Sequence, residues 1–196
     1  MRYSVQHKKH TRDKILEAAS RLFRERGYNG VGVDAVMAEA GLTAGGFYAH
    51  FNSKEALFSE TFAATMEART EDLRAKLKGQ TGMDWLRTLI NSYLSRTHKN
   101  MIADGCPLPA LTSDIARSSD VTRAAYEKNL RQYLSRIEAN MPESSTPKRE
   151  RSLALVAHLL GGVMVARAVS DENLSNEILK ASRRAAIAMC EGSIEK

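Results

Sequence analysis

The sequence lacks the signatures of several large classes of protein. Its only two cysteines, Cys106 and Cys190, are too far apart to form a C-x-x-C metal motif. It contains no G-x-S-x-G, P-loop or H-E-x-x-H pattern and no paired carboxylates in an apolar setting. We therefore expect a protein that is not an enzyme and that has no zinc site, no other metal centre and no cofactor.

Long apolar runs are also missing. No stretch approaches the roughly 18 apolar residues that a membrane span requires. The N-terminal sequence, MRYSVQHKKHTR, lacks the apolar segment of a signal peptide. We expect a cytoplasmic protein with no membrane partner, and a reducing compartment disfavours a disulfide between the two cysteines.

What the chain does contain is a pair of short helical patterns on either side of Gly41. Before this glycine, apolar residues at positions i, i+3, i+4 and i+7 form one face of a helix of about two turns. These residues are Val33, Val36, Met37 and Ala40. Gly41 favours exit from a helix through positive φ, Leu42 can plug the turn, and Thr43 can cap the next helix. The pattern predicts a helix, a short turn and a second helix.

The second of these helices has an unusually small outer face. Phe47 and Phe51 are four residues apart and share an inward face, which turns Gly45 and Ala49 outward. The flanks carry Ala44 and Tyr48 on one side and Gly46 and His50 on the other. Two glycines cost roughly 1 kcal/mol each relative to alanine in a helix interior, so this face suits close approach to another surface. We favour the recognition helix of a helix-turn-helix in the DNA major groove. The alternative, a helical hairpin that only packs, leaves the glycines unexplained.

A longer ordered pattern covers residues 11–58, TRDKILEAASRLFRERGYNGVGVDAVMAEAGLTAGGFYAHFNSKEALF. Through its A-G-L-T turn, G-x-F-Y core and S-K-E-A-L continuation, the chain resembles the TetR family of transcriptional regulators. It departs from many relatives at Ala44, where they carry a polar or basic side chain. The resemblance implies an all-α fold, with a three-helix DNA-binding domain expected at 1–52 and a larger ligand-binding and dimerisation domain at 53–196.

The resemblance also implies a double-stranded DNA operator as partner. The expected DNA-binding residues are Arg12, Thr43, Ala44, Gly45, Gly46, Tyr48, His50 and Lys54. Lys54 lies in the first turn of a predicted helix, where free N–H groups suit a phosphate. Residues 1–27 contain eight lysine and arginine residues against three acidic ones, so nearly all of the net charge of +6 lies there. A solvated tail is the alternative for residues 2–9, but beside a helix-turn-helix we favour phosphate contact.

Apolar periodicity predicts helices along the rest of the chain. We expect them at 11–27 with Thr11 as N-cap, and at 54–77, 83–101, 107–117, 120–140, 153–166 and 174–189. Segment 153–166 is apolar on every side except at His158, so it requires burial on more than one side. We expect homodimerisation through these C-terminal helices, with Gly161 and Gly162 allowing close approach.

Candidates for a ligand cavity come from polar, aromatic and sulfur-containing residues, each with plain core packing as its alternative. They are Met66, Trp85, Tyr93, Cys106, Tyr126, His158 and Arg167. Cys106 precedes the helix that begins at Pro107, and the positive end of a helix dipole can lower a thiol pKa. Cys106 is therefore either a sensor of oxidants or electrophiles or a core residue, and Asp104 opposes thiolate formation.

These observations, together with the resemblance, predict a homodimeric transcriptional regulator. We expect a repressor that binds a palindromic operator and is released by an unknown small-molecule effector. The alternative class is a helical interaction module or small-molecule carrier that does not bind an operator.

Overall fold

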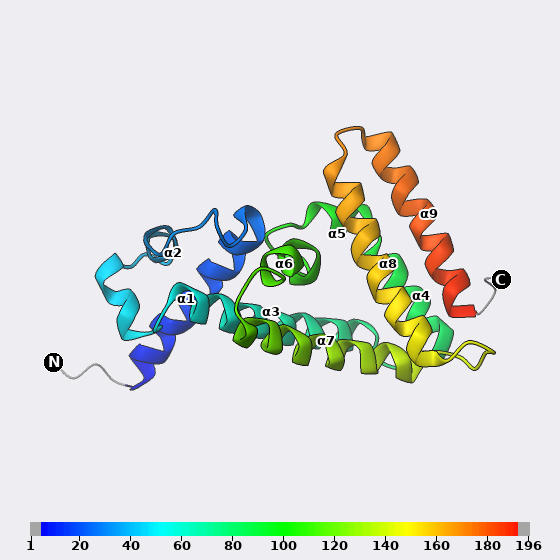
Figure 1. Cartoon of the computed structure of the whole chain (residues 1–196), viewed down its shortest axis with the longest axis horizontal. Coiled ribbons are helices and arrows are strands. Elements are labelled where there is room, and N and C mark those ends of the chain that lie inside the picture. Colours follow the sequence, from blue (N-terminus) through cyan, green and yellow to red (C-terminus); the bar gives the residue numbers. More distant parts are fainter. Residues whose placement is uncertain (1–4, 192–196) are drawn as a thin grey trace.

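The computed structural model describes residues 5–191, and that part of the chain is helical without strands (Figure 1). The predicted all-α fold is confirmed. The helices are α1 (Val5–Arg26), α2 (Val33–Glu39), the 3-10 helix η1 (Ala44–Ala49), α3 (Lys54–Lys76), α4 (Gly82–Tyr93), α5 (Arg96–Asn100), α6 (Pro107–Ile115), α7 (Asp120–Asn140), α8 (Lys148–Ala168) and α9 (Glu172–Glu191).

The N-terminal helices pack around aromatic side chains. Phe23 of α1, Phe47 of η1 and Phe58 of α3 are fully buried, and the rings of Phe23 and Phe58 meet edge to face with centroids 5.2 Å apart. Gly27, with φ of 70°, follows the end of α1 as expected. The expected N-cap at Thr11 is wrong, because α1 already begins at Val5 and no glycine or proline in residues 5–10 interrupts it.

Helix α3 joins the two ends of the molecule. It begins beside η1, where the Ser53 hydroxyl accepts a hydrogen bond from the Ala56 N–H at 3.0 Å. It then packs against α1, α6 and α7, and it runs alongside α7 through the middle of Figure 1. The contacts of α3 therefore connect the N-terminal helices with the C-terminal ones.

The helix expected at 83–101 is two helices in the structure. Helix α4 ends at Tyr93, and α5 begins at Arg96 with Ser95 as its N-cap. The Ser95 hydroxyl accepts from the His98 N–H at 3.1 Å and donates to the Ser92 carbonyl at 2.8 Å. A serine side chain that bonds its own backbone in this way competes with continuous helix, which explains the break.

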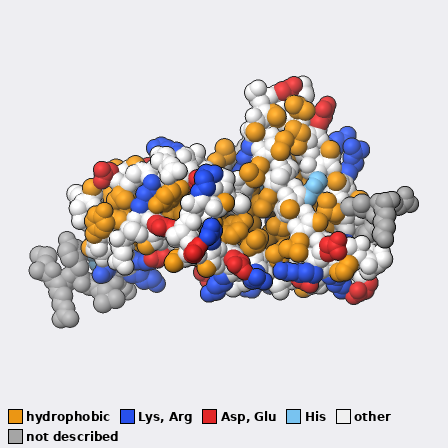
Figure 2. All heavy atoms as spheres, viewed as in Figure 1, with side chains coloured by type: hydrophobic (Ala, Val, Ile, Leu, Met, Phe, Trp, Pro, Cys, Tyr) orange, Lys and Arg blue, Asp and Glu red, His pale blue; other side chains and the backbone are white. Residues whose placement is uncertain are grey.

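Helices α8 and α9 form a hairpin that projects at the end of the molecule opposite α2 (Figure 1). Leu155, Leu159 and Val163 of α8 are buried, whereas Leu153 and Val165 remain 47% and 53% exposed. Figure 2 shows apolar side chains on this projecting end. By length and composition alone α8 would pass as a membrane span, so the expectation that no segment approaches one is too strong. Its inner face packs against α9, as in the core helix of a globular protein.

The two adjacent glycines of α8 face different surroundings. A Cβ atom added at Gly162 would lie 2.9 Å from both Leu94 Cδ2 and Ser182 Oγ. A Cβ atom added at Gly161 would meet nothing within 4 Å. Gly162 therefore serves packing inside the chain, and only Gly161 lies on the open side where the sequence suggested that both would allow close approach.

Candidate nucleic-acid interface and ligand cavity

Residues 44–49 form a 3-10 helix, η1, where an α-helix was expected. The Gly46 N–H donates to the Thr43 carbonyl at 3.1 Å, and the His50 N–H donates to the Phe47 carbonyl at 2.9 Å. Adjacent glycines weaken α-helix formation, and 3-10 geometry is common in pieces this short. Thr43 occupies the N-cap position, but its side chain makes no capping hydrogen bond. Gly41 has the expected positive φ, at 70°.

The outer face of η1 is nevertheless the one expected from the sequence. Phe47 and Phe51 are buried, with ring centroids 5.8 Å apart. The exposed residues are Thr43, Ala44, Gly45, Tyr48 and Ala49. Tyr48 is 73% exposed. The face is therefore small and smooth at its centre and carries an aromatic side chain at its edge.

Gly45, Gly46 and His50 differ in how closely other residues pack around them. A Cβ atom at Gly45 would meet nothing within 4 Å, whereas one at Gly46 would touch Met37 Cε at 3.6 Å. His50 is half-buried, and its Nδ1 has no hydrogen-bond partner among residues 5–191. Burial, aided by the charges of Lys8 and Arg12, lowers the pKa of His50 and favours its neutral form.

The two expected phosphate ligands beside η1 are held by aromatic rings. Lys54 Nζ lies 4.2 Å from the centroid of the Tyr28 ring, and the Arg12 guanidinium lies 4.5 Å from that of Phe51. Burial lowers the pKa of Lys54. Arg12 also forms an ion pair with Glu60, so part of its charge is already compensated. Arg2, from the same basic segment, lies outside the described residues.

The surface over the C-terminal helices has mixed charge. Along the lower edge of the face in Figure 2, lysine and arginine side chains alternate with acidic ones. On α7, ion pairs join Arg131 to Glu127 and Arg123 to Asp120. These pairs leave the net positive charge concentrated toward the N-terminal helices.

A cavity of about 450 Å³ lies among α3, α4, the α5–α6 segment and α7. Its lining includes three of the expected ligand residues, Met66, Tyr93 and Cys106. The other residues that line it are Arg69, Thr70, Asp72, Leu73, Lys76, Leu89, Ser92, Ser95, Thr97, His98, Met101, Gly105, Leu108 and Tyr133. The volume falls in the usual range for small-molecule sites.

Comparison with known proteins agrees with this arrangement. Residues 15–61 match the sequence model described as bacterial regulatory proteins, tetR family. This match covers α2, the turn and η1, together with the second half of α1 and the start of α3. The match assigns this N-terminal region to the TetR family. This region marks the chain as a DNA-binding transcriptional regulator, and its relatives are named as regulators rather than enzymes.

Individual TetR-family relatives are distant. The chain is 24% identical over 160 residues to the HTH-type transcriptional regulator LmrA of Bacillus subtilis (strain 168), covering 79% of this chain and 85% of LmrA. It is 30% identical over 89 residues to UidR of Escherichia coli (strain K12), covering 45% of this chain and only 44% of UidR. The crystal structure of a TetR transcriptional regulator from Chloroflexus aurantiacus superposes with a TM-score of 0.80 at 20% identity, covering 94% and 96% of the two chains. This likeness shows that the fold is shared.

Four expected ligand residues lie outside the cavity lining. Trp85 is buried in the core, and the Tyr126 hydroxyl lies 3.1 Å from Thr112 Oγ1. His158 Nε2 lies 3.0 Å from the Ser182 carbonyl oxygen and so joins α8 to α9. The Arg167 guanidinium donates to backbone carbonyls of α5. These four side chains serve packing and helix contacts, which the alternative of plain core packing anticipated.

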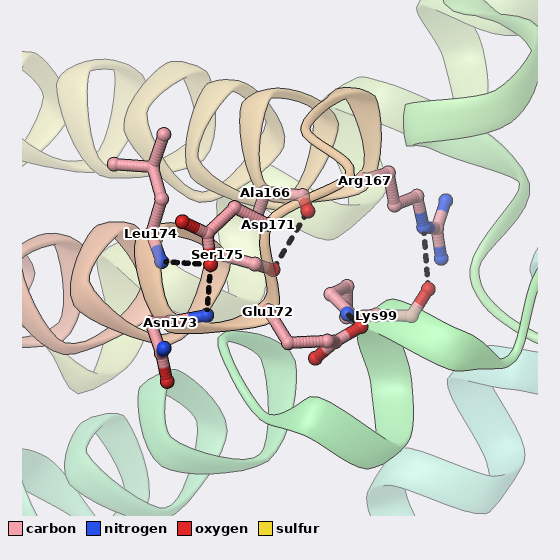
Figure 3. A network of polar contacts seen from close by, with 8 residues as sticks. All are labelled: Lys99, Ala166, Arg167, Asp171, Glu172, Asn173, Leu174 and Ser175. Atoms are coloured by element: carbon pink, nitrogen blue, oxygen red, sulfur yellow. Dashed lines mark hydrogen bonds and ion pairs between the residues drawn. The ribbon is translucent and has the colours of Figure 1, made fainter.

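Arg167 lies outside the cavity but stabilises α5, whose residues form part of the cavity lining. It donates to the carbonyls of Lys99 at 2.8 Å and His98 at 2.9 Å. Lys99 also pairs with Glu172 at 2.7 Å, at the start of α9 (Figure 3). The Ser175 hydroxyl closes the turn between α8 and α9 by donating to the Ala166 carbonyl at 2.8 Å. Helix α5 is therefore fixed to the α8–α9 hairpin.

His98 is a lining residue that sequence reasoning missed. Its Nε2 accepts the Cys106 N–H at 3.3 Å, so its Nδ1 carries the proton and donates to the Tyr93 carbonyl at 2.6 Å. Burial lowers the pKa of His98, consistent with a neutral ring. The expectation of one continuous helix at 83–101 left His98 unnoticed. The sequence signal that could have located it is Ser95, which caps a new helix in which His98 faces Cys106.

The expected lowering of the Cys106 pKa is wrong. Cys106 is the N-cap of α6, as predicted, and its thiol lies in the cavity wall. Burial raises the pKa of the thiol, and the opposing effects of the Leu108 N–H, Tyr93, Arg167 and Arg69 do not overcome it. The thiol is therefore neutral at rest, and a sensor role for Cys106 stays a prediction.

The cavity is connected directly to the DNA-binding helices of this regulator. Arg24, near the end of α1, donates through Nη1 to the carbonyl of Gly105 at 2.8 Å. The Tyr28 N–H donates to Asp114 Oδ2 of α6 at 3.0 Å. Burial lowers the pKa of Arg24 to about 10, so its guanidinium stays charged at neutral pH. These contacts connect the N-terminal and C-terminal helices in addition to α3. They could not be predicted from the sequence, because they join residues far apart along the chain.

Proposed function

We propose that the protein is a homodimeric repressor that binds a palindromic operator and is released by a small molecule. The observation that carries the proposal is the smooth, exposed face around Gly45, which lies beside the basic residues Lys54 and Arg12. In this proposal residues 1–52 bind DNA, residues 53–196 bind the ligand and dimerise, and the protein acts in the cytoplasm.

The proposed contacts divide into two kinds. Tyr48, Lys54 and the basic side chains of α1, including Arg12, hold phosphates and so position the protein, whereas Thr43, Gly45 and His50 approach base edges. Ala44, Gly46 and Ala49 offer only backbone or methyl contact. Part of the specificity therefore comes from DNA shape.

Lys54→Ala is expected to weaken binding to every DNA sequence by a similar factor. Removal of one phosphate contact should reduce the slope of log K against log salt concentration by about one. Fluorescence anisotropy at several salt concentrations measures this slope. Lys78→Ala, which removes the same charge from the exposed turn after α3, should leave the slope unchanged. An unaltered slope in Lys54→Ala would exclude its phosphate contact.

Dimerisation is proposed through the outer face of α8 and α9. The exposed apolar residues of this face are Leu153, Met164, Val165 and Leu174. Several exposed apolar side chains on one helical hairpin favour a protein–protein contact there. A two-fold dimer would place two copies of η1 in successive major-groove faces about 34 Å apart.

Release by ligand is proposed to act on the separation of the two recognition helices. The cavity touches α3, which begins beside η1, and the α5–α6 segment, which Arg24 ties to α1. A ligand can shift the equilibrium between the DNA-binding and released conformations only by its difference in affinity for the two. A fall of about 100-fold in operator affinity therefore requires a difference of roughly 2.7 kcal/mol in the ligand's binding free energy.

Arg24→Met is expected to weaken this coupling by about 1 kcal/mol, because the bond between α1 and the Gly105 carbonyl is lost. The measurement is the ratio of operator affinities without and with a releasing compound. Arg21→Met, on the exposed side of the same helix, is the matched control. A ratio in Arg24→Met equal to that of the wild type would exclude this route.

A gel shift with DNA from upstream of the protein's own gene tests the proposed function. We expect a discrete complex that non-specific competitor DNA does not displace and that a small-molecule ligand releases. A helical interaction module or carrier, the alternative class, would give no specific complex.

A further inference from the structure

The charged residues of the cavity lining belong to its exposed side. Arg69, Asp72 and Lys76 follow one another along one face of α3, and Arg69 pairs with Asp72 at 3.3 Å. By contrast, Tyr93 and Tyr133, from α4 and α7, are each only 8% exposed. The inner part of the cavity therefore contains polar but uncharged side chains.

Most polar atoms of the inner lining already have partners. Both ring nitrogens of His98 are bonded, to the Tyr93 carbonyl and the Cys106 N–H. Ser92 Oγ accepts from Lys76 Nζ at 2.6 Å, and the Ser95 hydroxyl caps α5. The Tyr93 hydroxyl, in contrast, is buried without a well-formed hydrogen bond in the described part of the chain, and its neighbour there is the Cys106 thiol, which is only a weak acceptor. A buried hydroxyl whose only nearby acceptor is weak is costly, and a stronger acceptor brought by a ligand would remove that cost.

The titratable groups of the inner lining all shift toward their neutral forms. Burial raises the pKa of Tyr93, of Tyr133 and of Cys106, and it lowers the pKa of His98. Burial in this environment disfavours charge of either sign, and for an anion the nearby Arg69 and Arg167 offset that penalty only in part. A ligand group placed there meets the same penalty if it is ionised.

We propose that the cavity binds an uncharged, largely apolar small molecule whose carbonyl or ether oxygen accepts a hydrogen bond from the Tyr93 hydroxyl. Leu73, Leu89 and Leu108 supply the apolar contacts, and the flexible Met66 side chain adapts to the outline of the ligand. As a statement about the effector, this inference rests on the proposed function. As a statement about binding, it concerns the free protein and needs no DNA.

Three matched probes test the inference by equilibrium dialysis against the full-length protein without DNA. They are 2-acetylnaphthalene, which carries a neutral carbonyl, 2-ethylnaphthalene, which lacks the acceptor, and 2-naphthoate, which is an anion of similar size. We expect the ketone to bind at least about tenfold more tightly than the carboxylate, because burying an ionised group is costly. Tyr93→Phe should weaken ketone binding about five- to tenfold and leave binding of the hydrocarbon unchanged.

Tyr126→Phe is the matched control, because Tyr126 does not line the cavity and its hydroxyl has a partner in Thr112. It should change the binding of no probe. Tyr93→Phe removes a buried hydroxyl that has no well-formed hydrogen bond, so the variant should unfold at or above the wild-type thermal midpoint. The inference is overturned if Tyr93→Phe affects ketone and hydrocarbon equally or affects neither. It is also overturned if the carboxylate binds as tightly as the ketone, or if the ketone does not bind.

A gel shift with the same ketone separates this inference from the proposed function. Selective ketone binding without release of DNA would support the ligand class and contradict ligand-released repression. Release of DNA by other compounds, without selective ketone binding, would support the proposed function and contradict the ligand class.

Discussion

Gly45→Leu is expected to reduce operator binding to the non-specific level, about 1,000-fold or more below that of the wild type. Gly45 is exposed at the centre of η1, and a Cβ atom there would meet nothing within 4 Å. The leucine side chain therefore fits the folded protein but occupies the space through which η1 would approach the bases. Fluorescence anisotropy gives the loss of affinity, and thermal unfolding should give an unchanged midpoint.

Ala139→Leu provides the control for added apolar bulk, because Ala139 is exposed near the end of α7 and far from η1 along the chain. It should change neither DNA affinity nor thermal midpoint. If Gly45→Leu binds the operator as tightly as the wild type, η1 does not enter the groove, and the proposed division of contacts is wrong.

The adjacent glycines of α8 should give opposite results when each is replaced by glutamate. Gly161→Glu places its side chain on the open face and should yield a folded monomer, because the carboxylate charges the proposed dimer interface. Loss of the two-site contact should then lower operator affinity about 100-fold or more. Gly162→Glu instead forces a side chain against Leu94 and Ser182 and should lower the free energy of unfolding by about 3 kcal/mol or more.

Sedimentation velocity at tens of micromolar and chemical denaturation distinguish these outcomes. We expect dimers for the wild type, folded monomers for Gly161→Glu and a destabilised chain for Gly162→Glu. Dimers of Gly161→Glu with wild-type affinity for DNA would exclude this face as the interface, and a monomeric wild type would exclude the proposed homodimer.

The features that could be predicted from the sequence depend on local rules. Gly41 leaves its helix with positive φ, Phe47 and Phe51 point inward, and Cys106 precedes the proline that begins α6. Each follows from the backbone preference of one residue or from a spacing of a few residues. For the same reason the outer face of η1 was predicted correctly although its helix type was not.

The features that could not be predicted depend on contacts between distant residues. Arg24 reaches the carbonyl of Gly105, and Arg167 reaches the carbonyls of α5. An arginine that binds a backbone carbonyl leaves no charge pattern in the sequence, because its partner is not an acidic residue. The raised pKa of Cys106 likewise results from burial by several helices, and the helix dipole alone pointed in the opposite direction.

Hydroxyl-radical footprinting on DNA from upstream of the gene, with wild type and Gly45→Leu in parallel, tests the central claim most directly. For the wild type we expect two symmetric protected half-sites whose centres are about 34 Å apart, one helical turn or a multiple of it. Gly45→Leu should protect neither half-site at the same protein concentration. Absence of any protected sequence with the wild type, or the same footprint with Gly45→Leu, would contradict the claim that this protein reads an operator through η1.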